Sequence, residues 1–74
     1  MKIEVRLFAT LREGRGKVVQ QDVPTGASVA TVVDALNIPH NDIAILLVNG
    51  RDGSLDRILQ EGDFLSVFPP VGGG

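Results

Sequence analysis

Hydrophobic and charged side chains alternate strictly at the start of the chain. Ile3, Val5 and Leu7 fall on one side, and the intervening positions carry charged groups. A period of two residues predicts a strand with one buried face. Two glycines within residues 13–16 indicate a turn. The β-favouring segment 17–23 then predicts a second strand, so the chain opens with a hairpin.

A helix is predicted next. Ser28 is a favourable N-cap, because its hydroxyl can accept a hydrogen bond from a first-turn amide. Val29, Val32, Val33 and Leu36 follow with the spacing of one buried helix face. Three valines lower the intrinsic helix propensity. We therefore expect the helix to be stabilised by its packing on the sheet. The helix should end at Asn37-Ile38-Pro39, because the residue before a proline disfavours the helical region.

The second half of the chain contains two further predicted strands. Residues 43–48 are almost all apolar, which predicts a central strand buried on both faces, and an Asn-Gly turn follows. Residues 55–59 are ambiguous between an edge strand and a single turn. Residues 64–68 predict the last strand.

This element order favours an α+β fold. A right-handed crossover carries the chain from the hairpin over the sheet. The most economical arrangement makes the first and last strands parallel neighbours. We therefore predict a ubiquitin-like β-grasp roll, with a mixed sheet of four to five strands and one main helix. Residues 1–68 form the predicted domain, and residues 69–74 form an extended tail.

The tail is the most informative segment. It consists of Pro69, Pro70, Val71 and then Gly72, Gly73 and Gly74. Proline fixes φ and favours an extended path, whereas glycine lets the backbone approach another surface closely. The segment is therefore interpreted as a tail that enters the active site of another protein and carries its chemistry on the Gly74 carboxylate. The alternative is an ordinary frayed terminus.

Strand parity predicts an aromatic pair at the root of this tail. Counting by twos, Phe8 follows Arg6 on the outer face of the first strand, and Phe68 lies on the outer face of the last. Parallel pairing would bring the two rings together. An exposed apolar patch there, with Arg6 at its rim, would suggest a partner interface. A twist that buries both rings in the core is the alternative.

Composition narrows the function further. The 74 residues carry a net charge of −2 and no cysteine. The charge argues against nucleic-acid binding, and no apolar run approaches a membrane span. We expect a cytoplasmic protein.

His40 is interpreted as a solvated loop residue, and the basic residues Arg12, Arg15 and Lys17 as a solvated turn rather than a docking patch. No nucleophile–base pair, metal set or phosphate loop is present, so the chain is interpreted as a protein cosubstrate with no bound cofactor.

The two ends of the chain resemble a known family. The opening 3–13, the Val48-Asn49-Gly50 segment and the ending Phe68-Pro69-Pro70-Val71 with Gly73-Gly74 are similar to the MoaD/ThiS sulfur carriers, most of all the molybdopterin synthase small subunit. The resemblance covers essentially the whole chain. It implies that a ubiquitin-activating-type adenylating enzyme uses ATP to form a glycyl adenylate at Gly74. Sulfur delivery then gives a 1-thioglycine thiocarboxylate, which a molybdopterin synthase large subunit consumes.

Three alternatives stay open at this point. The chain could carry sulfur for the thiamine thiazole or another sulfur-insertion pathway. It could be a ubiquitin-like modifier conjugated to lysines. It could also be a binding module whose glycine tail has no chemistry.

Overall fold

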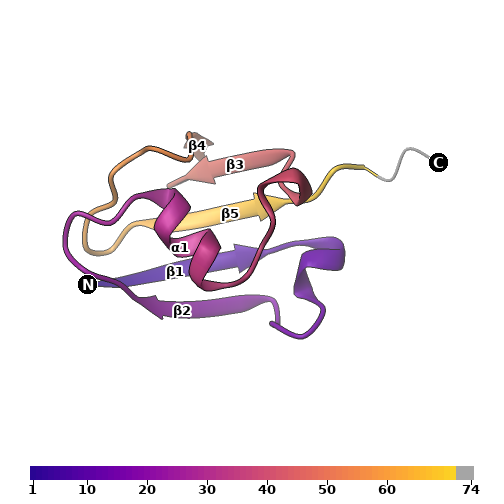
Figure 1. Ribbon diagram of the computed structural model, residues 1–74, viewed down its shortest axis with the longest axis horizontal. Helices are drawn as coiled ribbons and strands as arrows, with labels where there is room; N and C mark the ends of the chain where they lie inside the picture. Colours follow the sequence, from indigo (N-terminus) through magenta and orange to yellow (C-terminus); the bar gives the residue numbers. More distant parts are fainter. Residues whose placement is uncertain (72–74) are drawn as a thin grey trace.

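A computed structural model describes residues 1–71 (Figure 1). Five strands form one sheet in the order β2-β1-β5-β3-β4. The elements in chain order are β1 (Lys2–Leu7), the 3-10 helix η1 (Ala9–Arg12), β2 (Val18–Asp22), α1 (Val29–Ala35), the 3-10 helix η2 (His40–Asp42), β3 (Ile45–Val48), β4 (Arg51–Asp52) and β5 (Phe64–Phe68).

The strand pairing is that of a β-grasp roll. β1 pairs antiparallel with β2 and parallel with β5, at the centre of the sheet. β3 pairs antiparallel with both β5 and β4. α1 crosses one face of the sheet, and no helix of residues 1–71 lies over the opposite face (Figure 1). The predicted fold and the parallel pairing of the first and last strands are confirmed.

The core lies between α1 and the sheet. The Ser28 hydroxyl accepts a hydrogen bond from the Thr31 amide at 3.3 Å, so the predicted N-cap is present. Val29, Val32 and Val33 are fully buried, as are the inward-facing residues of β1 and β5. This helix has only seven residues. Its stability therefore comes from the buried valines, as the sequence predicts.

The prediction for β3 is wrong in one respect. The strand begins at Ile45 and alternates instead of being buried on both faces. Leu46 and Val48 face the core, whereas the Ile45 side chain is 51% exposed. The reason is that nothing in residues 1–71 covers the second face of the sheet. The apolar residues of β3 therefore fall on two different surfaces: one side of the strand packs in the core, and the other side is an exposed apolar surface.

The ambiguous segment 55–59 contains a single turn rather than a regular edge strand, because the Arg57 amide donates to the Ser54 carbonyl at 3.1 Å. Ile58 forms an isolated bridge to Ser28, and the Leu59 amide donates to the Ala27 carbonyl at 2.9 Å. Leu59 is buried and anchors the loop under the helix.

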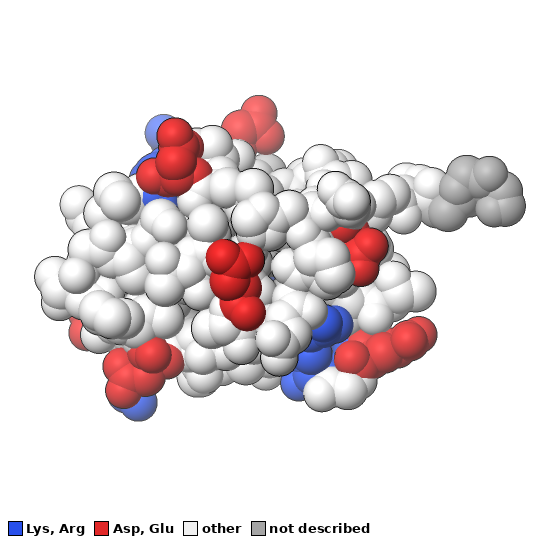
Figure 2. Space-filling view, in the orientation of Figure 1, with Lys and Arg blue, Asp and Glu red and all other residues white. Residues whose placement is uncertain are grey.

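No helix in residues 1–71 is long and apolar enough to cross a membrane. Figure 2 shows the helix-covered face, with carboxylates scattered over it.

Candidate partner-binding site at the root of the tail

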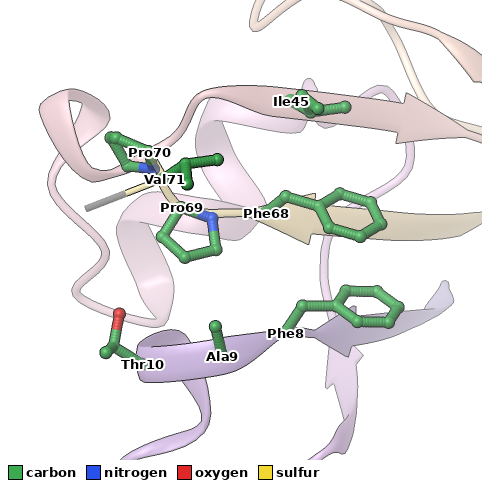
Figure 3. Close-up of a pocket in the computed structure, with 8 residues that line it drawn as sticks. All are labelled: Phe8, Ala9, Thr10, Ile45, Phe68, Pro69, Pro70 and Val71. Carbon is green, nitrogen blue, oxygen red and sulfur yellow. The ribbon is translucent and has the colours of Figure 1, made fainter. Parts of the chain in front are cut away.

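Phe8 and Phe68 meet on the uncovered face of the sheet. The parallel register pairs Leu7 with Val67, so the next residue of each chain segment is a phenylalanine. The two rings stack with their centroids 4.1 Å apart and their planes 9° from parallel (Figure 3). Both side chains are half-buried. The predicted meeting of the rings at the tail root is confirmed, and neither ring belongs to the closed core.

An apolar groove runs beside this pair. Its volume is about 520 Å³. It lies between η1, the first residue of β3 and the start of the tail (Figure 3). The groove is lined by Phe8, Ala9, Thr10, Ile45, Phe68, Pro69, Pro70 and Val71. The core does not need these side chains, and the groove is wide enough for a side chain of another protein.

The floor of the groove depends on a turn that the sequence did not predict. Ala9 adopts a φ of 52°, in the left-handed region, and opens the 3-10 helix η1. The Leu11 amide then donates to the Phe8 carbonyl at 3.1 Å, and Leu11 is buried. The chain thus leaves the sheet directly after Phe8. A non-glycine residue in this conformation costs about 1–2 kcal/mol, which the buried Leu11 helps to offset.

Arg6 occupies a different place from the one predicted. Its guanidinium carbon lies 4.1 Å from the centroid of the Phe64 ring, and its Nε donates to a Glu4 carboxylate oxygen at 2.6 Å. Arg6 therefore covers Phe64, at the opposite end of β5 from Phe68. The cation beside the stacked pair is Arg12, whose Cζ lies 5.3 Å from the centroid of the Phe8 ring.

The basic residues near the hairpin turn do not form one solvated cluster. Arg15 donates to three carbonyls, those of Leu11, Leu36 and Asn37, at 3.0–3.1 Å. It therefore ties the turn to the end of α1, which corrects the prediction of a solvated side chain. Sequence spacing held one signal for Arg12. Arg12 comes four positions after Phe8, a spacing that brings two side chains together on a helical turn.

The tail leaves the sheet where β5 ends. The Ala44 amide donates to the Phe68 carbonyl at 2.8 Å, and this is the last bond of the β3–β5 ladder. Pro69 and Pro70 have no amide hydrogen, so they cannot continue the strand. Val71 is 94% exposed. The predicted conjugation residues Gly73 and Gly74, and the tail residue Gly72, lie outside the described residues.

The other polar residues have structural roles. His40 Nε2 lies 2.7 Å from an Asp34 carboxylate oxygen, so it contacts the helix rather than solvent alone. Asp63 accepts hydrogen bonds from the Asn49 side chain and from the Gln60 amide, so it stabilises the turn that precedes β5. These bonds hold the pKa of the Asp63 carboxyl below its usual value. No group of histidines and carboxylates within residues 1–71 could hold a metal ion.

Comparison with known proteins gives a consistent result. The ThiS family model matches residues 5–74. Small archaeal modifier protein 3 of Haloferax volcanii is 34% identical, and the match covers 100% of both chains. The crystal structure of Haloferax volcanii SAMP1 superposes with a TM-score of 0.83 and 30% identity over 100% of both chains.

A second archaeal structure is nearly as similar. It belongs to a Pyrococcus furiosus protein assigned as subunit 1 of the molybdopterin converting factor. The TM-score is 0.80 and the identity 29%, over 96% of this chain and 99% of that one.

Proposed function

Since the chain belongs to the ThiS family of ubiquitin-like sulfur carriers and modifiers, we propose that it carries sulfur on its C-terminal glycine for molybdopterin synthesis. The observation that carries this proposal is the family match, which runs through residue 74 and so includes both Gly73 and Gly74. The Pyrococcus furiosus relative supports the molybdopterin (or tungstopterin) branch. On this view the chain is a protein cosubstrate rather than an enzyme.

The chemistry follows from the properties of a carboxylate. A free α-carboxylate is ionised at neutral pH and is a poor acyl electrophile. A ubiquitin-activating-type adenylating enzyme would therefore join the Gly74 carboxylate to AMP from ATP and release pyrophosphate. Hydrosulfide from the sulfur donor would then attack the acyl carbon, AMP would leave, and the resulting thioacid would lose its proton. The product is a thiocarboxylate, which a molybdopterin synthase large subunit would use as its sulfur source.

The surface at the tail root fits the docking step of this cycle. A partner that processes Gly74 must hold the body of the carrier while the tail enters its pocket. Six residues beyond Phe68 can extend up to about 20 Å. The stacked pair Phe8–Phe68 and the groove lie where the tail begins. We propose that both partners bind the body there. Arg6, which lies over the Phe64 ring at the other end of β5, would contribute a contact on the same face.

Mass spectrometry tests the carrier function directly. The chain is incubated with the adenylating enzyme of the same genome, ATP and a sulfur donor. We expect a gain equal to the mass difference between sulfur and oxygen, located on Gly74. A variant that lacks Gly74 is the control and should show no gain, with an unchanged melting temperature. No gain in the full chain, with an adenylating enzyme of proven activity, contradicts the proposal.

The acceptor pathway needs a separate experiment. The thiocarboxylated chain is offered to the molybdopterin synthase large subunit with a pterin precursor, and in parallel to a thiazole synthase. Formation of molybdopterin only in the first reaction supports the proposed branch. Thiazole formation would move the chain to the thiamine pathway and leave the carrier chemistry intact.

The names of the Haloferax relatives favour a second function, that of a protein modifier. In that case the activated glycine would form an isopeptide bond with a lysine of another protein. Peptide mass spectrometry of cells that express a tagged chain would detect lysines carrying its C-terminal residues. Such conjugates should disappear when Gly74 is deleted.

A further inference from the structure

Arg12 and Arg15 lie on the same turn but use their guanidinium groups differently. All three Arg15 nitrogens donate to backbone carbonyls, at 3.0–3.1 Å. Arg12 uses only Nε, which donates to the Leu7 carbonyl at 2.8 Å. Within residues 1–71, its two terminal nitrogens have no hydrogen-bond acceptor and no carboxylate at ion-pair distance.

The position of Arg12 is nevertheless fixed. Phe68 stacks on one face of the Phe8 ring at 4.1 Å, and the Arg12 guanidinium carbon lies over the same ring, 5.3 Å from its centroid. One hydrogen bond and one aromatic ring thus hold a half-buried cation beside the groove. The guanidinium brings a positive charge and planar N–H donors to this place.

The contrast with Arg6 indicates what Arg12 lacks. Arg6 also lies over an aromatic ring, but its charge is balanced by Glu4 at 2.6 Å. Arg12 has the same kind of aromatic contact and no such counter-ion among the described residues. A guanidinium with free terminal nitrogens is suited to a carboxylate, which can accept two parallel hydrogen bonds. Arg12 therefore resembles an anion-binding group whose carboxylate partner is not among the described residues.

We propose that Arg12 recognises a carboxylate of the protein that docks in the groove. The inference rests on the proposed function, because that protein is the adenylating enzyme that activates Gly74. The partner places an apolar side chain against the Phe8–Phe68 pair and an Asp or Glu side chain beside it, on Arg12. The ion pair fixes the orientation of the carrier body, and so the direction in which its tail enters the pocket. Arg12 acts as a specificity residue of the interface.

The binding affinity of the adenylating enzyme of the same genome tests this proposal. Arg12→Gln removes the charge and keeps a similar length. We expect its dissociation constant to rise about 10-fold at an ionic strength of about 0.05 M, and the difference to shrink at about 0.5 M. Arg51→Gln, which removes an equal charge from the edge strand β4, is the control and should bind like the parent. Arg12→Lys should recover part of the affinity, since it restores the charge without the planar fork.

Two further measurements separate the possible failures. Phe68→Ala reports whether this face binds the partner at all. If Phe68→Ala weakens binding and Arg12→Gln does not, Arg12 has no recognition role, and the proposed function stands. If Arg12→Gln weakens binding equally at both ionic strengths and lowers the melting temperature, the residue only holds the turn and the inference is wrong. If binding is unchanged in all variants and no Gly74 adenylate forms, the proposed function fails.

A charge exchange gives the most specific support. Arg12→Glu should abolish binding at low ionic strength. An Asp→Arg or Glu→Arg substitution on the partner, at the carboxylate that faces Arg12, should restore it. Failure of every such exchange on the partner's docking surface overturns the proposed ion pair.

Discussion

The two faces of the sheet carry apolar side chains for different reasons. On the helix-covered face, Val5, Leu7, Leu65 and Val67 are fully buried, and their burial holds α1 in place. On the open face, Phe8 and Phe68 are only half-buried, and Ile45 is 51% exposed. Packing explains the first set completely. It does not explain why large apolar side chains occupy the second.

The open face also differs in its charged groups. No charged side chain is buried in the described core, whereas Arg6 and Arg12 lie over aromatic rings on the open face. Aromatic and arginine side chains are the residues most enriched at binding hot spots. We therefore propose that one face provides stability and the other provides recognition of partners. Substitutions on the two faces should separate these properties.

The largest effect is expected on the covered face. Val33 lies on the fully buried face of α1, so Val33→Asp would place a carboxylate in the core without a partner. Such a change should cost more than about 4 kcal/mol and leave this small domain largely unfolded. Circular dichroism melting measures the loss. Thr31→Asp, on the exposed side of the same helix, is the control. A melt like that of the parent for Val33→Asp would show that the helix face is misassigned.

The second largest effect is expected from a substitution on the open face. This substitution should weaken partner binding more than it lowers folding stability. Phe68→Ala removes one ring of the stacked pair at the tail root. We expect the dissociation constant for the adenylating enzyme to rise about 30-fold, which corresponds to about 2 kcal/mol. The loss of folding stability should stay below the 3–5 kcal/mol of a core Phe→Ala change, because the ring is half exposed.

Both quantities must be measured on the same variant. Chemical denaturation gives the stability, and titration calorimetry gives the affinity of the folded fraction. A collapse in stability with unchanged affinity would place Phe68 in the core and end the proposed division between the faces.

The sequence predicted the covered face better than the open one. Alternation in β1 and the valine spacing in α1 identify core residues, because burial alone determines those positions. The parity of Phe8 and Phe68 predicted their contact, because strand side chains alternate between the two faces and the two strands pair in parallel. The 3-10 helix at Ala9–Arg12 was missed, since its left-handed start is an alanine rather than a glycine. The roles of Arg12 and Arg15 depend on that turn, and side-chain hydrogen bonds to distant carbonyls leave no periodic signal.

The smallest effect concerns a region that belongs to neither face. At the end of the sheet away from the tail, Asn49 donates to Asp63 at 2.9 Å, and the Gln60 amide donates to its second oxygen at 2.8 Å. These bonds favour the ionised carboxylate, so the pKa of Asp63 lies below its ordinary value of 3.8 in the folded protein. The stabilisation is therefore complete above the unfolded pKa and is lost as the pH falls through the folded one.

Asp63→Asn keeps the Asn49 contact but offers an amide NH₂ to the Gln60 amide, so it should cost about 1 kcal/mol at neutral pH. The difference in unfolding free energy between parent and variant should shrink below about pH 4, with partner binding at neutral pH unchanged. A difference that stays constant down to about pH 2 would show that the ionised carboxylate is not what these bonds stabilise.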